Sequence, residues 1–356
     1  MKKLLIYLFP IFLCSNLYSV ELKILEWEGY ISPYANDFQK YAKSKGIDVS
    51  IKIIKPYISN PDQIYKAIRA GEVDIVTPTH NYYKMDNNRL LNLLSPIDLD
   101  RLKNYPNITN SLKNRSFDLY KGERYSVPLL GGSYALAYNS EKVKEPDSWN
   151  VLWDIKNKGK ISITDEQFEA NLCSTILALG YKTDSCFDID MGNLDLKEVR
   201  QKLNKLVLNT KVFWKGIPDT KKMRELHYIT DYWFGVSLAN KEGQKWKIAN
   251  PKEGQTVWLD TIAISNKIKD KKKLDATYLL LDFMISPKIQ KKIYKMYGSV
   301  IVNTKTAQFM SEDEVKKSYV GNESFFNEDY LWKPLSSRTR NAFKILWQDA
   351  LKESGK

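Results

Sequence analysis

Strand-like and helix-like segments alternate through the first eighty residues, and this alternation constrains the fold more than any other feature. Two helices separate the strands: residues 33–45 carry apolar side chains at helical spacing, and Asn60-Pro61 opens the second helix. The strands are predicted at residues 21–27, 49–54 and 74–77. This order predicts an α/β lobe with a parallel sheet, in which ligands bind beyond the carboxyl ends of the strands. Residues 27–30 and 79–82 should therefore line one crevice.

The remaining segments predict a second lobe and a return to the first. The predicted strands are residues 126–130 and 133–139, which cross between the lobes, and 161–164, 211–213 and 257–264. The predicted helices are residues 167–179, 195–208, 273–285, 287–297 and 337–351. No low-complexity linker interrupts them, so we expect two interleaved α/β lobes joined by crossing strands, with a ligand cleft between them. The predicted lobes are residues 20–132 plus about 262–305, and residues 133–261 plus about 306–356.

The N-terminus has the pattern of an export signal. Met1-Lys2-Lys3 precedes an apolar run at residues 4–13, which is too short for a membrane-spanning anchor. We expect a signal peptide at residues 1–19 and an exported mature protein. A lipid anchor at Cys14 is an alternative, but the bulky residue Leu13 before it disfavours that anchor.

Charge and cysteine content exclude some functional classes. The formal net charge is +13, but the Lys residues are spread along the chain without an Arg/aromatic module, so we expect a solvated basic surface and no nucleic-acid partner. Cys173 and Cys186 could form a disulfide in an oxidising compartment or remain buried thiols. The two histidines, His80 and His227, have no ligand spacing with a cysteine, so neither a metal nor a cofactor is expected.

Residues 251–265 suggest a binding strand. A Pro/Gly turn precedes a strand-like segment in which Trp258 and Asp260, two residues apart, share one face. An indole and a carboxylate together can hold an organic cation, through cation–π contact and a charge-assisted hydrogen bond. The alternative is a core Trp beside an Asp that caps a turn.

Seven segments in one order resemble the spermidine/putrescine-binding proteins of bacterial ABC importers. The segment "PKEG…VWLDTIAI" resembles the ligand strand of this family, and the resemblance covers nearly all of the mature chain. It implies the periplasmic-binding-protein fold and a monomer that captures a polyamine, putrescine or spermidine, and delivers it to an inner-membrane permease. The matching segments are residues 27–33, 73–79, 125–132, 148–154, 160–169, 232–235 and 251–264.

The resemblance also implies the residues of the binding site. Asp260 and Trp258 match the amine-binding carboxylate and indole, and two or three carboxylates with aromatic walls would suit a diamine or triamine. Glu166 and Glu169 could instead charge the first turn of a helix, and Trp233 and Tyr30 could be core aromatics. The predicted ligand-binding residues are Trp27, Tyr30, Thr79, Tyr82, Glu166, Glu169, Trp233, Trp258 and Asp260.

Three positions depart from the family pattern and leave the ligand open. Gly131 stands where the family usually has a Trp, Asn81 stands near an aromatic position that Tyr82 could supply, and Lys215 lies near a small polar position. A cation at residue 215 would repel an amine. A shorter diamine, another organic cation, or a ligand with a negative group reaching Lys215 are the alternatives.

Two other functions use the same residues. Glu166 and Glu169 could be the carboxylate pair of a periplasmic glycan-cleaving enzyme, which would require a sugar groove between them. A sensor that reports to a signalling partner is the other alternative. The sequence has no phosphate-binding glycine loop and no Gly-x-Ser-x-Gly elbow, so we expect a binding protein and no catalytic residues.

Overall fold

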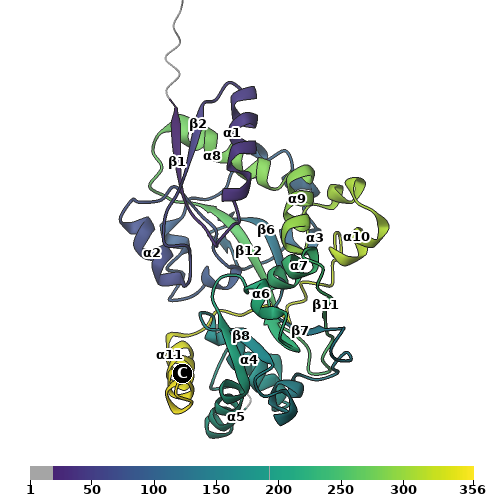
Figure 1. Ribbon diagram of the computed structural model, residues 1–356. Helices are drawn as coiled ribbons and strands as arrows, with labels where there is room; N and C mark the ends of the chain where they lie inside the picture. The colour runs from purple at the N-terminus through teal and green to yellow at the C-terminus, as the bar shows by residue number, and fades with distance from the viewer. Residues whose placement is uncertain (1–18, 192) are drawn as a thin grey trace, which may run out of the picture.

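Two five-stranded sheets organise the protein, one in the upper and one in the lower half of Figure 1. The computed structural model describes residues 19–191 and 193–356. Apart from Ser19, the signal peptide predicted at residues 1–19 lies outside the described residues, as does Cys14.

The first sheet combines parallel strands with one antiparallel strand, β12 (Val257–Ile264). It also contains β1 (Val20–Leu25), β2 (Val49–Ile53), β3 (Ile75–Val76) and β6 (Val127–Ser133). Its order is β2–β1–β3–β12–β6, with β1 parallel to β2 and β3, and β12 antiparallel to β3 and β6. The predicted parallel core is thus present, and β12 lies within the sheet with a partner on each side.

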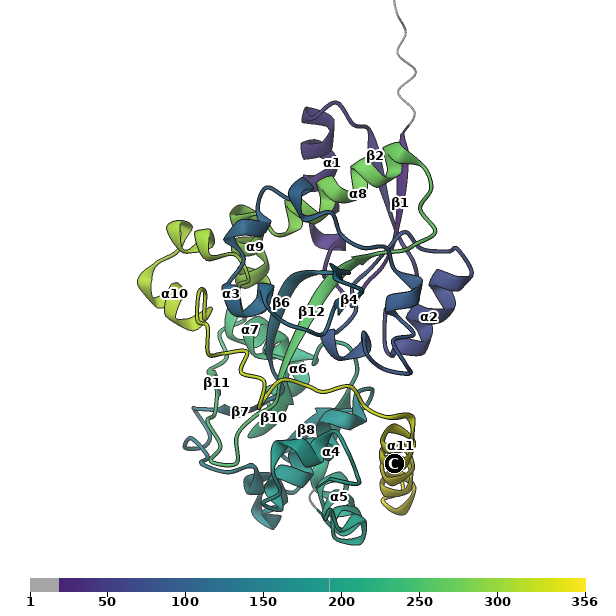
Figure 2. The same cartoon turned by 180° about the vertical axis from the view of Figure 1, so that it is seen from behind.

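Side-chain alternation along β1 fills a core on each face of this sheet. Leu22 and Ile24 join the core that contains side chains of α1 and α8, whereas Leu25 joins the core formed with α2. Figures 1 and 2 show these helices on opposite sides of β1. The side chain of Asn60 accepts a hydrogen bond from the Gln63 amide at the start of α2, as expected for a cap. The helices are α1 (Ala35–Ser44), α2 (Pro61–Arg69) and α8 (Lys271–Met284).

The second sheet has the order β11–β7–β10–β8–β9. Its strands are β7 (Ala135–Asn139), β8 (Ile161–Thr164), β9 (Thr210–Trp214), β10 (Tyr228–Asp231) and β11 (Trp246–Ile248). One group of helices packs together beside it, and the others form a separate small core with Ala137 and Ile229. The first group is α4 (Phe168–Ala178), α5 (Leu196–Asn209) and α11 (Ser337–Glu353), and the second is α6 (Thr220–Met223) and α7 (Phe234–Lys241).

Three segments of the described chain connect the two halves of the molecule. β6 passes into β7 through Tyr134, and β12 returns from the second sheet to the first. Figure 2 shows the third, the C-terminal segment that runs from α10 across the middle of the molecule to α11. The remaining elements are α3 (Asn110–Lys113), β4 (Leu119–Tyr120), β5 (Glu123–Arg124), α9 (Pro287–Tyr297) and α10 (Glu312–Lys317). The predicted α/β class with crossing strands is confirmed, while the predicted lobe boundaries stay a prediction.

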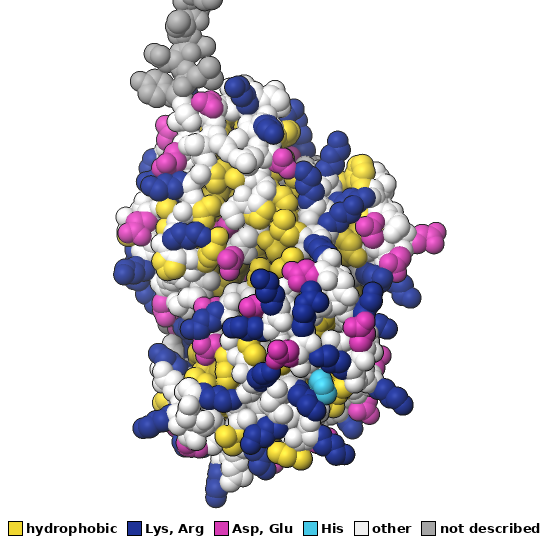
Figure 3. Space-filling model, in the orientation of Figure 1, with side chains coloured by type: hydrophobic (Ala, Val, Ile, Leu, Met, Phe, Trp, Pro, Cys, Tyr) yellow, Lys and Arg dark blue, Asp and Glu magenta, His cyan; other side chains and the backbone are white. Residues whose placement is uncertain are grey.

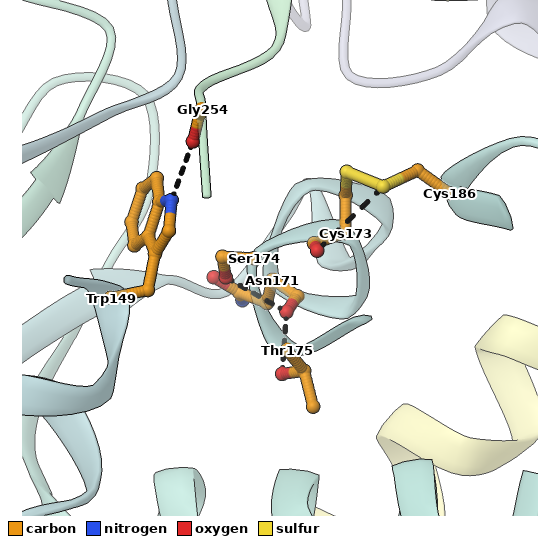
Figure 4. The surroundings of a disulfide bond; sticks show 7 residues. All are labelled: Trp149, Asn171, Cys173, Ser174, Thr175, Cys186 and Gly254. Atoms are coloured by element: carbon orange, nitrogen blue, oxygen red, sulfur yellow. Dashed lines mark hydrogen bonds between the residues drawn. A yellow bond between two sulfur atoms is a disulfide. The ribbon is translucent and has the colours of Figure 1, made fainter. Parts of the chain in front are cut away.

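A disulfide joins Cys173 of α4 to Cys186. Figure 4 shows it at the side of α4, with Trp149 on the other side of the helix donating its indole N–H to the Gly254 carbonyl at 2.8 Å. The bridge closes a short loop, which ties the segment after α4 back onto this helix.

The surface carries both charges. Figure 3 shows Lys and Arg side chains spread over the visible face among Asp and Glu, with no single basic stripe on that face. Among residues 19–191 and 193–356, no helix combines the length and the apolar character needed to cross a bilayer. The same residues contain no group of three or more His, Cys, Asp or Glu side chains that could hold a metal ion.

Candidate ligand-binding site

A cavity of about 350 Å³ lies where the strand ends of the two sheets face each other. Its lining draws on the segments after β1, β3, β8 and β9, which is where ligands bind in open parallel sheets. Of the predicted site residues, the lining includes Trp27, Tyr30, Thr79, Glu166, Trp258 and Asp260.

Asp260 is a buried acid in the lining of this cavity. The side chain is 4% exposed, and the Tyr30 hydroxyl donates to its Oδ2 at 2.5 Å. Among the described residues, Oδ1 is buried and has no hydrogen-bond partner. Burial raises the pKa of Asp260 from 3.8 to about 7, against the lowering effect of the nearby Thr79 and Tyr30 hydroxyls. A buried carboxylate with one unpaired oxygen is a site for a cation.

Aromatic rings surround this carboxylate. Trp258 contacts Tyr232 and Phe234 edge to face, with centroid distances of 5.9 and 5.7 Å. Tyr232 also contacts Trp214 and Trp332 in the same edge-on manner. The Trp258 indole N–H and the Tyr232 hydroxyl are buried without a partner among the described residues. Rings packed edge to face leave other ring surfaces open to the cavity, where methylene groups and cations bind well.

Trp233 points away from the cavity, so the structure does not place this predicted residue at the site. Its backbone has a positive φ of 76°, its indole donates to the Ser133 hydroxyl at 3.0 Å, and its ring packs against Tyr319 and Phe325. The left-handed turn brings the neighbours Tyr232 and Phe234 into the lining instead. No local sequence signal predicts this turn, because a bulky residue rarely has positive φ.

Asp231 stabilises this turn. Its carboxylate accepts hydrogen bonds from the amides of Gly235 and Val236, at 3.3 and 2.8 Å, at the start of α7. An acid is favourable at a helix N-terminus, where the amides have no helical partner. Burial nevertheless raises the pKa of Asp231 to about 7. The cap fixes the direction in which Tyr232 and Phe234 leave β10.

The cavity mouth carries two more acids. Glu166 accepts a hydrogen bond from the Gly216 amide at 3.0 Å, and Glu28 lies against the same glycine. Lys215, which was expected to repel an amine, forms an ion pair with Asp165 at 3.3 Å. The mouth therefore presents the carboxylates of Glu28 and Glu166 beside Lys215, whose positive charge is balanced by Asp165. Glu28 was not among the residues predicted for the site.

A second cavity of about 440 Å³ adjoins the first and contains Tyr82 and Glu169. Both cavities share Trp332 and Glu166 in their linings. The Glu169 carboxylate pairs with the Arg340 guanidinium, with Nε and Oε1 3.4 Å apart. Burial raises the pKa of Glu169, and Arg340 opposes this effect. We call the cavity around Asp260 the inner compartment and the one around Glu169 the outer compartment.

Phe326 explains why a glycine is found at position 131. A Cβ on Gly131 would lie 2.6 Å from the Phe326 ring and 2.7 Å from the Trp258 carbonyl oxygen. Phe326 is 1% exposed, so its ring occupies space that a larger side chain at position 131 would need. Asn81 is buried in the outer compartment, next to Tyr82.

Comparisons with known proteins agree with this architecture. The family model for bacterial extracellular solute-binding proteins matches residues 34–320. The chain is 27% identical over 301 residues to the spermidine/putrescine-binding periplasmic protein of Escherichia coli, covering 82% of this chain and 80% of that protein. It is 23% identical over 347 residues to the putrescine-binding periplasmic protein SpuD of Pseudomonas aeruginosa, covering 92% and 90%.

A solved structure shares the fold. The substrate-binding protein of a Streptococcus pneumoniae spermidine/putrescine ABC transporter has a TM-score of 0.73 and 22% identity, covering 95% of this chain and 100% of that one. This likeness supports the expected periplasmic-binding-protein fold. The family match over residues 34–320 shows that the chain belongs to the bacterial extracellular solute-binding proteins.

Proposed function

We propose that this protein is the substrate-binding component of an ABC importer, that it binds a polyamine, putrescine or spermidine, and that it delivers the amine to an inner-membrane permease. It acts in the periplasm as a monomer, without a cofactor and without catalysing a reaction. The observation that carries the proposal is the buried Asp260 carboxylate, which among the described residues has one oxygen held by Tyr30 and one without a partner in an aromatic cavity.

An alkylammonium group satisfies each requirement of the inner compartment. Its N–H groups can donate to the free oxygen of Asp260, and the aromatic walls supply cation–π contact and cover the methylene chain. A second ammonium at the other end of the chain would lie near Glu28 and Glu166 at the mouth. A neutral sugar would leave the buried carboxylate without a counter-charge, which is costly.

The relatives and the connections between the sheets support a transport role. Curated relatives from several bacteria are named as spermidine/putrescine-binding or putrescine-binding periplasmic proteins. The ligand cavity draws its walls from both sheets, which are joined by the crossing strands β6 and β12. In proteins of this design, hinge closure around the ligand creates the form that a partner recognises. The glycan-cleaving alternative has less support, because Glu169 is paired with Arg340.

Titration of the purified mature protein with putrescine and spermidine tests the proposal. Four tryptophans line the inner compartment, so intrinsic fluorescence should respond to binding, and calorimetry should give one site. Asp260→Asn and Trp258→Ala should each abolish binding. Asp282→Asn is the matched control, since Asp282 is also a buried carboxylate but accepts a hydrogen bond from the Asn104 amide and lines neither cavity. A folded protein that binds neither amine would contradict the polyamine assignment.

A further inference from the structure

We propose that Arg340 acts as a resident cation of the cleft and makes the site selective for a diamine over a triamine. This inference rests on the proposed polyamine function and narrows its ligand class. The guanidinium of Arg340, on the C-terminal helix α11, pairs with the Glu169 carboxylate, which an ammonium group of the ligand would otherwise contact.

Arg340 connects acidic groups from the two halves of the molecule. Its Nε lies 3.4 Å from Glu169 on α4, and its NH1 lies 3.3 Å from Asp62 on α2. The Arg340 side chain is 23% exposed, although Asp62 itself is 63% exposed. A planar guanidinium can bond two carboxylates at once, and it stays charged at every physiological pH.

The two compartments consequently differ in charge. In the inner compartment, the acids Asp260, Glu28 and Glu166 face Lys215, which is already paired with Asp165. In the outer compartment, the carboxylates of Asp62 and Glu169 share Arg340, and the lining adds the cation Lys344 and the acid Glu166, which is common to both compartments. Ammonium groups are therefore attracted more strongly to the inner compartment and its mouth than to the outer compartment, where Arg340 offsets the carboxylates and repels a nearby cation.

A ligand's length then decides how well it binds. A diamine can place one ammonium at Asp260 and the other near Glu28 and Glu166, within the inner compartment and its mouth. A triamine bound at Asp260 is longer, and extending it past Trp332 and Glu166, which line both cavities, places its third ammonium in the outer compartment beside Arg340. Like charges brought together in a partly buried cleft repel each other, so the longer amine should bind more weakly by about tenfold or more.

The affinities of putrescine and spermidine for four proteins test this inference by calorimetry. The proteins are the wild type, Arg340→Gln, Arg340→Lys and the control Arg338→Gln. Arg338 is a suitable control because it lies two residues away on the same helix, is 73% exposed and pairs with Asp190 outside the cavities. Far-ultraviolet circular dichroism and thermal unfolding verify that each variant is folded.

The wild type should prefer putrescine by about tenfold or more, and Arg340→Gln should reduce this ratio by a similar factor because Glu169 becomes available. Arg340→Lys and Arg338→Gln should keep the preference. Adding Glu169→Gln to Arg340→Gln should remove the gained affinity for spermidine, which links the gain to that carboxylate.

Three results would overturn the inference while leaving the polyamine function intact. The first is a wild type that binds both amines equally, and the second is an unchanged ratio in folded Arg340→Gln. The third is a ratio that falls as far in Arg340→Lys as in Arg340→Gln, since shape rather than charge would then be responsible. Binding of neither amine to the wild type would overturn the proposed function and this inference together.

Discussion

Replacement of Asp260 by Asn should make the ligand-free protein more stable at alkaline pH while abolishing amine binding. The carboxylate is 4% exposed, and burial raises its pKa from the ordinary value of 3.8 to about 7. Because the folded pKa is the higher one, the folded state holds a proton that the unfolded state releases. The stabilising effect of this proton is complete below about pH 4 and is lost as the pH rises through 7.

The expected size follows from the shift. Three pKa units at about 1.4 kcal/mol each give a loss of roughly 4 kcal/mol between pH 4 and pH 8, as an upper limit because water can enter the cleft. Asn resembles the protonated acid, can still accept the Tyr30 hydrogen bond and does not ionise. Asp231 also has a raised pKa, but it is present in both proteins and cancels from the difference.

Urea unfolding of both proteins at several pH values between 4 and 8 measures this effect. The two free energies of unfolding should be similar at pH 4 and should diverge as the pH rises, with the variant more stable at pH 8. Putrescine at 100 times its Kd should add about 2.7 kcal/mol to the wild type and nothing to the variant. Parallel stability curves for the two proteins would refute the assignment of a raised pKa to Asp260.

Three further predictions concern the same cleft and its supports. Tyr30→Phe removes a hydroxyl donor to the buried carboxylate, and should weaken amine binding at pH 8 by about 1.5–3 kcal/mol in calorimetry. Reduction of the Cys173–Cys186 disulfide should lower the free energy of unfolding by about 3 kcal/mol, since the bridge closes a loop with a separation of 13 residues. Gly131→Ala should destabilise the protein by about 1–3 kcal/mol, because the added methyl group meets Phe326, and Phe326→Leu should recover part of this loss.

Each of these predictions has its own control. Tyr105→Phe removes a hydroxyl outside both cavities and should leave amine affinity unchanged. The stability of a Cys173→Ser/Cys186→Ser variant should not change with reductant, so a loss of stability there would point to another cause. If Gly131→Ala unfolds at the same urea concentration as the wild type, the close contact with Phe326 does not constrain this position.

Much of the fold could be predicted because periodicity and capping are local properties. The helices α9 and α11 begin at Pro287 and Ser337, as their patterns indicated. Among the elements that were missed, β10 and α7 lie around the turn at Trp233. A strand that ends in a left-handed residue and passes directly into a helix has no periodic signal long enough to detect.

The candidate site was predicted less completely, for a physical reason. Asp260 and Trp258 share a strand, so their common face follows from their spacing. Tyr232, Phe234 and Arg340 reach the cleft because of a backbone turn and a helix from the far end of the chain. Such tertiary contacts leave no mark in local sequence, and the pairing of Arg340 with Glu169 is one of them.

The position of β12 has a kinetic consequence. Trp258 and Asp260 lie on the part of β12 that pairs with β6, and Asp260 also forms a bridge with Thr79, so these groups need little ordering when a ligand arrives. The association rate of the amine should therefore be limited by its diffusion into the cleft. The residence time of the bound amine should be limited by how often the two halves of the protein separate. Arg340 joins those halves through Asp62, and its removal should shorten the residence time of putrescine more than it slows association.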